Sequence, residues 1–292
     1  MAQPVALQHT LTAPITTRMP IPPTAQIVAL EGPDALAFAH TQFTSQVTAL
    51  ANDQWQFSSW LDAQGRVRAL FHLARLDDER LLLVLRGGDA TTFAEALHRF
   101  VFRSRVKIVV ADGWTLSDAP STHAINMYAV DANSDAIRLG CGTHTLQLNA
   151  NINDIGDVND AWRDAELHAG WPWLADDALG EFVAPALSLH RLGAVALDKG
   201  CYPGQEIVAR LHYRGGNKRH LHRVQLSMPV SDGAALLRNG REFVRLLNAT
   251  SHAERVEALA VIADDVASNI AQGTENTSDD GIEVKLLETW QN

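Results

Sequence analysis

The sequence predicts an α+β fold that ends in a small antiparallel β-barrel. Helix-like and strand-like segments alternate up to about residue 216, Gly215-Gly216 interrupts the pattern, and alternating apolar residues follow. The chain has 292 residues, and a single hydrophobic core usually divides beyond ~250–300 residues. We therefore expect two domains, at residues 1–216 and 217–292.

Turn residues indicate where the elements of the first domain begin. Gly32-Pro33-Asp34 can open a helix, and Asp62-Ala63-Gln64-Gly65 can join two strands, because apolar residues alternate after this turn. Gly87-Gly88-Asp89 marks the start of a second helix. The expected elements are a strand at 26–30, a helix from 34 to about 47, a hairpin of strands over 54–62 and 66–76, a strand at 81–86, a helix at 91–102 and a strand at 106–112.

The remaining segments lead into the predicted barrel. A weaker β-rich section extends to Leu148, a polar connection covers 149–160, and a helix at 161–169 ends at Gly170. A helix at 205–213 is stopped by Gly215-Gly216. Alternating apolar residues then predict three strands of the barrel: Val224, Leu226 and Met228; Val256, Ala258, Ala260 and Ile262; Ile282, Val284 and Leu286.

The composition excludes several classes of protein. A formal net charge of −10 opposes a general affinity for DNA or RNA, because phosphate binding requires a positive surface. The two cysteines have no CxxC spacing, so neither a disulfide scaffold nor structural zinc is expected, which fits the reducing cytoplasm. The first residues lack a signal-peptide pattern and the apolar runs are too short to cross a bilayer, so we expect a soluble protein with no membrane partner.

One segment departs from the acidic balance of the chain. Residues 210–223 contain no acidic residue and five cations: Arg210, Arg214, Lys218, Arg219 and Arg223. Such a run can be a solvated turn and strand edge, or it can be an anion site. The sequence leaves both interpretations open.

Cys201 lies in the segment DKGCYPGQEIVAR, at 198–210. Lys199 and the N-terminus of the helix expected after Gly204 would both favour a thiolate, which is the reactive form of cysteine. The alternative is a small buried apolar residue, the usual role of a free cysteine. No metal is expected, because the spacing of the clustered histidines matches no familiar site: His212, His220 and His222.

The segment from Glu181 to Arg210 resembles the signature of the YgfZ family of folate-binding proteins, which is related to the T protein (aminomethyltransferase) of the glycine cleavage system. Its core is KGCYPGQE, from Lys199 to Glu206. The resemblance implies T-protein-like intertwined subdomains around a central folate cavity, with tetrahydrofolate as the ligand. It also implies a role in tRNA modification and iron–sulfur enzyme maintenance, with tRNA or the enzymes of these processes as partners. Further segments agree in the same order, at 32–47, 61–75, 99–108, 162–174 and 213–219.

The resemblance also implies roles for single residues. Trp162 matches a family tryptophan at the folate site, where an indole can stack on the ligand rings; the alternative is a core residue of an amphipathic helix. The family has a second tryptophan near the start of the first strand. Its place falls around Ala25 in this chain, so this stacking partner is missing. Arg68 and Ala69 stand where T proteins have paired aspartates, so aminomethyl transfer is not expected. The candidate folate-binding residues are Trp162, Tyr202, Gln205, Glu206, Arg210 and His168, which replaces a glutamate of related sequences.

The leading hypothesis is a cytoplasmic folate-binding accessory protein. The candidate catalytic residues are Cys201, as the reactive group, and Lys199, which would favour its thiolate. Gln205 and Glu206 would orient a partner, and Arg210 would receive the folate glutamate tail or an RNA phosphate. One alternative is a folate-dependent one-carbon transferase that uses another carboxylate. A second is a pure binding module in which Cys201 only packs, and unchanged function in a folded Cys201→Ser variant would support it.

Overall fold

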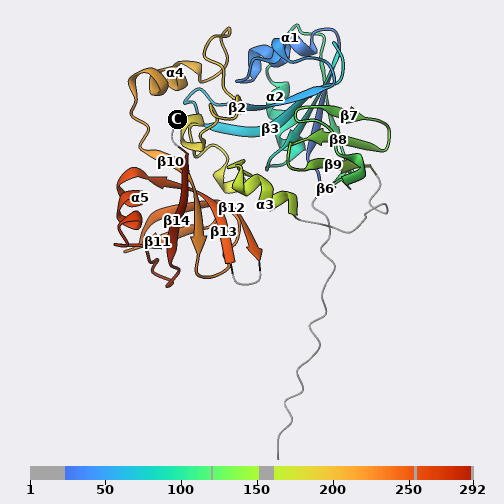
Figure 1. Cartoon of the computed structure of the whole chain (residues 1–292). Helices are drawn as coiled ribbons and strands as arrows, with labels where there is room; N and C mark the ends of the chain where they lie inside the picture. Colours follow the sequence, from blue (N-terminus) through green and yellow to red (C-terminus); the bar gives the residue numbers. More distant parts are fainter. Residues whose placement is uncertain (1–23, 120, 151–160, 253–254, 291–292) are drawn as a thin grey trace, which may run out of the picture.

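In the computed structural model, residues 24–119, 121–150, 161–252 and 255–290 are described. They form three antiparallel sheets and five α-helices (Figure 1). The α+β class is therefore confirmed. The first 23 residues and most of the predicted connection at 149–160 lie outside these ranges. None of the described helices is long and apolar enough to span a bilayer.

The first sheet has five strands in the order β2-β3-β4-β1-β5. Each strand was expected from the sequence. Asp62 closes the β2–β3 turn, because its Oδ1 accepts hydrogen bonds from the backbone N–H groups of Gln64 and Arg66, both at 2.9 Å. The strands are β1 (Ile27–Glu31), β2 (Gln54–Leu61), β3 (Val67–Arg75), β4 (Arg80–Leu85) and β5 (Lys107–Ala111).

Helices α1 (Ala35–Gln42) and α2 (Ala90–His98) bury one face of this sheet in a core of their own. Both helices end earlier than predicted. After α1, Phe43 adopts an extended backbone, and the N–H of Thr44 donates to the Ser59 carbonyl of β2 at 3.0 Å. The backbone after Phe43 therefore pairs with β2, and the helix does not continue to Val47 as the apolar spacing predicts. Beyond α2, i→i−3 bonds tighten the last turn, which ends the helix.

A second sheet has four short strands in the order β6-β9-β8-β7, and the C-terminal sheet has five in the order β11-β12-β13-β10-β14. Among the described residues the C-terminal pairing runs from β11 at one edge to β14 at the other, so an antiparallel sheet is present and closure into a barrel is not confirmed. The sequence did not predict β11, β12 or α5. The bounds are β6 (Thr115–Asp118), β7 (Val130–Ala132), β8 (Ala136–Gly140), β9 (Thr145–Asn149), β10 (Arg219–Leu226), β11 (Ala235–Arg238), β12 (Arg241–His252), β13 (Arg255–Ala263), β14 (Val284–Trp290) and α5 (Asp264–Ala271).

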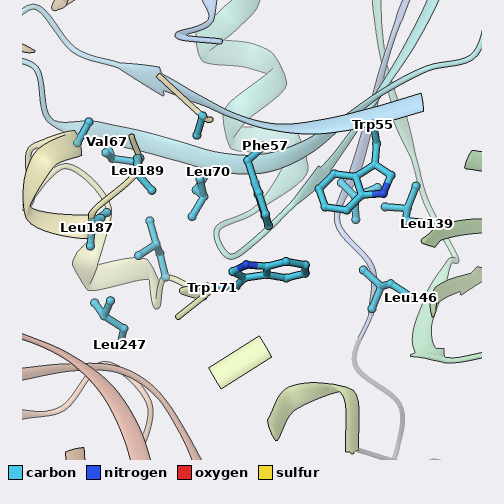
Figure 2. Close-up of a cluster of buried hydrophobic side chains, with 14 of the residues drawn as sticks. Trp55, Phe57, Val67, Leu70, Leu139, Leu146, Trp171, Leu187, Leu189 and Leu247 are labelled. Carbon is cyan, nitrogen blue, oxygen red and sulfur yellow. The ribbon is translucent and has the colours of Figure 1, made fainter. Parts of the chain in front are cut away.

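The largest core lies where the three sheets meet. Figure 2 shows Phe57 of β2 above the ring of Trp171, with a centroid distance of 5.0 Å, while Leu139 and Leu247 come from the second and C-terminal sheets. Helix α3 (Ala161–His168) lies between the first sheet and the C-terminal sheet (Figure 1). Residues on both sides of position 216 thus share one core, and the domain boundary at that position stays a prediction.

Candidate functional site

The motif KGCYPGQE forms an irregular loop that leads into α4 (Gln205–Arg214), and we call residues 199–204 the thiol loop. Lys199 anchors its start. Its Nζ donates to the carbonyls of His40 and Phe43, both at 2.6 Å, and of Ser45 at 2.8 Å, which uses all three donors of an ammonium group. The His40 and Phe43 carbonyls lie at the C-terminal end of α1, where a cation is favourable. Burial lowers the pKa of Lys199 to about 8, and the three acceptors favour the charged form.

Tyr202 and Gln205 hold the middle and end of the loop. The Tyr202 hydroxyl donates to the Ala196 carbonyl at 3.1 Å, and the Lys199 Nζ lies 5.2 Å from the centre of the Tyr202 ring. Burial raises the pKa of Tyr202 to about 12, so the phenol stays neutral. Gln205 Nε2 donates to the Lys199 carbonyl at 3.3 Å. Both candidate residues therefore support the conformation of the thiol loop.

The close of the loop requires glycine. Gly204 has a φ of +77°, and a Cβ at this position would lie 2.5 Å from the Asp62 carbonyl oxygen and 2.9 Å from the Gly65 Cα. The thiol loop is thus packed against the β2–β3 turn, backbone to backbone. Any side chain here would combine left-handed backbone strain with a clash.

The two cysteines lie in opposite environments. The Cys201 thiol is exposed and the Cys141 thiol is buried. Cys141 Sγ lies 3.4 Å from the Leu139 carbonyl, and burial raises the pKa of this thiol, so it is inert. Cys201 is therefore not a packing residue of the core. Its predicted partnership with Lys199 stays a prediction, since every donor of Lys199 is engaged by a carbonyl.

Helix α4 follows the thiol loop and carries two more candidate residues, Glu206 and Arg210. Both are exposed. Of the cations in the basic stretch, Arg210, Arg214 and Lys218 are exposed and form no ion pair with any described residue. Arg219 lies 3.9 Å from the carboxylates of Glu181 and Glu242, and Arg223 lies 3.1 Å from Glu257. The structure thus divides the stretch into a free part on and after α4 and a neutralised part on β10.

The three histidines of this region have separate partners. The His212 ring stacks on His190 at a centroid distance of 5.0 Å. His220 Nε2 lies 3.3 Å from Asp264, and His222 Nδ1 lies 2.9 Å from the Thr289 hydroxyl. The structure does not bring them together.

Sequence reasoning missed a buried ion pair between α3 and the first sheet. Arg86 Nη2 donates to Glu166 Oε2 at 2.9 Å, and both side chains are fully buried. Trp173 Nε1 donates to the same oxygen at 2.6 Å, and His144 Nε2 lies 3.4 Å from Oε1. Burial opposes ionisation of Glu166, but the Arg86 charge and the nearby His144 outweigh it and hold the pKa of this carboxyl well below its usual range. Glu166 comes four residues after Trp162, so the two share one helix face, and this signal could have found it.

The same cluster contains the groups most nearly arranged for a metal ion. Ligand atoms of His72, Cys141 and Glu166 lie within 4.8 Å of one another. Arg86, however, already binds Glu166 and lies 3.3 Å from His72 Nε2. Burial first, and the Arg86 charge second, lower the pKa of His72 well below its ordinary value. A dication would face a guanidinium and a protonated thiol, so the cluster fits an arginine–carboxylate pair better than a metal.

The two candidates on α3 point in different directions. Trp162 is 1% exposed and lies edge-on to Trp173, with a centroid distance of 5.5 Å. His168 is exposed; its Nδ1 lies 2.8 Å from the Asp164 carbonyl and its Nε2 lies 3.6 Å from Glu257 of β13. The structure thus places Trp162 in the core and His168 against the C-terminal sheet.

The chain is similar in sequence to several known proteins. No family model matches it. It is 27% identical over 222 residues to the tRNA-modifying protein YgfZ of Yersinia enterocolitica and 29% identical over 234 residues to that of Sodalis glossinidius, covering 67% of each chain in both cases. An uncharacterized protein of Haemophilus influenzae is 27% identical over 217 residues, 72% of this chain and 75% of the relative. The chain is related to the YgfZ proteins.

The structural comparison agrees with this relationship. The aminomethyltransferase T of the glycine cleavage system from Bartonella henselae superposes with a TM-score of 0.62 at 17% identity, over 82% of this chain and 76% of that one. The likeness confirms a T-protein-like α+β fold and concerns the fold alone. The predicted resemblance to YgfZ and T proteins is thereby confirmed.

The two β3 positions at which the resemblance to T proteins led us to look for an acidic pair lie beside a hollow. Arg68 and Ala69 line a space of about 300 Å³ together with Trp60 and Phe93. Two carboxylates also line it, Asp89 and Asp176, although Asp89 Oδ1 already caps α2 by accepting from the Thr92 N–H at 2.7 Å. Arg68 therefore brings an arginine to the lining of this hollow.

Proposed function

We propose that this chain is a cytoplasmic folate-binding accessory protein of tRNA modification and iron–sulfur enzyme maintenance, with the Cys201 thiol as its reactive group. The observation that carries the proposal is the thiol loop, which holds one exposed thiol on a backbone anchored by Lys199, Tyr202 and Gly204. The relatives named as tRNA-modifying proteins support the tRNA role, and the T-protein-like fold supports folate. The iron–sulfur role rests on the resemblance of the motif alone.

Each candidate has a role in the proposal. Cys201 reacts as the thiolate, Lys199 keeps the loop in place and favours that thiolate, and Gln205 and Glu206 orient the partner. The folate rings pack beside Trp162, with Tyr202 and His168 as further folate contacts. Because the Trp162 ring is 1% exposed, bound folate has to uncover it. Arg210 receives an anionic group from one of the ligands.

A folate titration tests the folate part. Adding 5,10-methylene- or 5-formyl-tetrahydrofolate is expected to quench tryptophan fluorescence saturably, because a folate ring would contact the Trp162 indole. In Trp162→Leu the affinity is expected to fall about 2- to 10-fold, because the aromatic ring is removed and aromatic contacts contribute ~0.5–1.5 kcal/mol. Trp290→Leu is the matched control, since Trp290 lies at the end of β14 with its ring 5.1 Å from the Arg191 guanidinium and is not a folate candidate. No saturable response to either folate would contradict the folate part.

Replacing the thiol tests the reactive role. Cys201→Ser is expected to lower the modified nucleosides that depend on this protein to the level of a deletion strain, because a serine hydroxyl does not ionise at neutral pH. The fold should be unchanged, since Cys201 is exposed. The readout is the nucleoside content of tRNA from cells that carry only the variant gene. Cys141→Ala, which removes the buried sulfur, is the control, and wild-type nucleosides in Cys201→Ser would favour the binding-module alternative.

The transferase alternative has one observation in its favour, the Asp176 carboxylate at the hollow beside Arg68. The accessory role is preferred because β3 supplies Arg68 and Ala69 instead of the acidic pair. Formation of methylenetetrahydrofolate from tetrahydrofolate and an aminomethyl donor would reverse this preference.

A further inference from the structure

One side of α4 faces solvent. Val208 is the only fully buried residue of α4, so the helix is held along one side and exposes the other. Arg210, Tyr213 and Arg214 are exposed on the helix, and Lys218 is exposed just beyond it. We call these four residues the α4 face. Positions three and four apart lie on one side of a helix, which places Tyr213 and Arg214 beside Arg210. The exposed Glu206 lies one turn before Arg210 on the same side and forms no ion pair with a described residue, so the three cations of the face outnumber this carboxylate.

The charge of the α4 face is not neutralised within the described part of the chain. Arg210, Arg214 and Lys218 lack ion pairs there, whereas the neighbouring Arg219 and Arg223 have carboxylate partners. The chain as a whole carries a formal charge of −10. The unpaired cations of the α4 face therefore indicate a binding site for an anionic ligand. Because the protein as a whole is acidic, such a ligand would bind at this face and be repelled elsewhere.

An exposed aromatic ring lies among these cations. The Tyr213 side chain is 74% exposed. Its ring contacts His212 edge-on at 4.9 Å, and His212 stacks on His190 at 5.0 Å with an interplanar angle of 20°. Burial and then the His212 charge lower the pKa of His190, which keeps this inner ring neutral. The two histidines thus contact one edge of the tyrosine, and most of the Tyr213 ring stays exposed to solvent.

We propose that the α4 face binds RNA, with Arg210, Arg214 and Lys218 on phosphates and Tyr213 stacked on an unpaired base. The proposal rests on the proposed function, which makes tRNA the source of the RNA. Phosphates pair with exposed cations, and unpaired bases stack on exposed aromatic rings. An acidic polypeptide would use the cations and leave the ring without a partner. The exposed thiol of Cys201 lies in the loop that leads into the same helix, so RNA held here is presented near the reactive group.

The salt dependence of tRNA binding tests the cations. Affinity for an unmodified tRNA transcript is measured by fluorescence anisotropy over a series of KCl concentrations. Changing Arg210, Arg214 and Lys218 together to Gln is expected to reduce the slope of log K against log salt by about 2–3, since each phosphate contact contributes ~0.7–0.9. The matched control changes three exposed cations that form no ion pair with described residues, Lys107, Arg241 and Lys285, to Gln, and its slope should equal that of the wild type.

Tyrosine variants test the stacking. Tyr213→Ala is expected to weaken binding roughly 5- to 150-fold with an unchanged salt slope, the range seen when base stacking is removed. Tyr213→Phe should bind as the wild type does, because it keeps the ring. Poly-L-glutamate should compete much less well than single-stranded RNA of equal charge. Equal competition, or equal loss in Tyr213→Phe and Tyr213→Ala, would show that the face is a general anion surface and would overturn the RNA assignment.

The outcomes separate this proposal from the proposed function. If the triple Gln variant binds tRNA as the wild type does while Cys201→Ser still abolishes modification, the RNA surface is wrong and the function stands. If the triple Gln variant loses its salt slope while Cys201→Ser is silent, the surface stands and the reactive role fails. A wild-type protein that does not bind tRNA overturns the surface.

Discussion

Arg86→Met is expected to lower the free energy of unfolding by about 3–5 kcal/mol, because it leaves the Glu166 carboxylate buried without its cation. Both side chains are fully buried, and Arg86 also donates to the carbonyls of Trp171 and Pro172 at 2.9 Å. The substitution thus removes one charge and several donors from the contact between α3 and the first sheet. Urea unfolding at pH 7, followed by far-UV circular dichroism, measures the change.

A second variant separates the lost pair from lost packing. Arg86→Met combined with Glu166→Leu should recover a large part of the stability, since replacing a buried pair by apolar groups is often neutral. Arg105→Ala is the matched surface control, because Arg105 lies 3.2 Å from Asp34 in an exposed pair, and its effect should be much smaller. An Arg86→Met protein as stable as the wild type would contradict the view that this pair holds α3.

The ion pair also predicts the direction of a pH effect. The folded pKa of Glu166 lies below the unfolded value, so the stability it contributes is present above the unfolded pKa of about 4.3. It is lost as the pH falls through the folded value, because the unfolded state then binds more protons. The double variant should lack this part of the acid destabilisation.

Lys199→Met is expected to lower the free energy of unfolding by about 2–4 kcal/mol, because one ammonium serves three carbonyls and a hydrogen bond to a charged group contributes ~1.5–3 kcal/mol. The side chain is 9% exposed. Its removal frees the thiol loop from α1, so amide hydrogen exchange should increase in residues 199–204. Lys285→Met, at an exposed lysine, is the control. Wild-type exchange in Lys199→Met would contradict the anchoring role.

The same variant tests the influence of Lys199 on the thiol. If Lys199 favours the thiolate, the pH midpoint of Cys201 alkylation by iodoacetamide should rise in Lys199→Met. Cys141 is buried, so labelling of the folded protein reports Cys201.

The sequence was sufficient for the elements defined by their immediate neighbours. The alternation from Val67 to Leu73, the Asp62 turn, and the helix between Gly204 and Gly215 were predicted and are present. Strand β12 was missed because arginine and asparagine interrupt its apolar alternation, as at Arg245, which pairs with Asp177 and Glu242. Such partners cannot be read from a local pattern.

By itself, then, the sequence determined the α+β class, most elements of the first sheet, and the motif that carries Cys201. The tertiary structure alone decided where α1 ends, that Cys201 is exposed, that Arg86 and Glu166 are buried as a pair, and which cations of the basic stretch stay free. The reason is separation along the chain. Lys199 bonds to Phe43 across 156 residues and Arg86 to Glu166 across 80, and burial or charge pairing at such positions depends on how distant segments pack, whereas periodicity and turn chemistry act over a few residues.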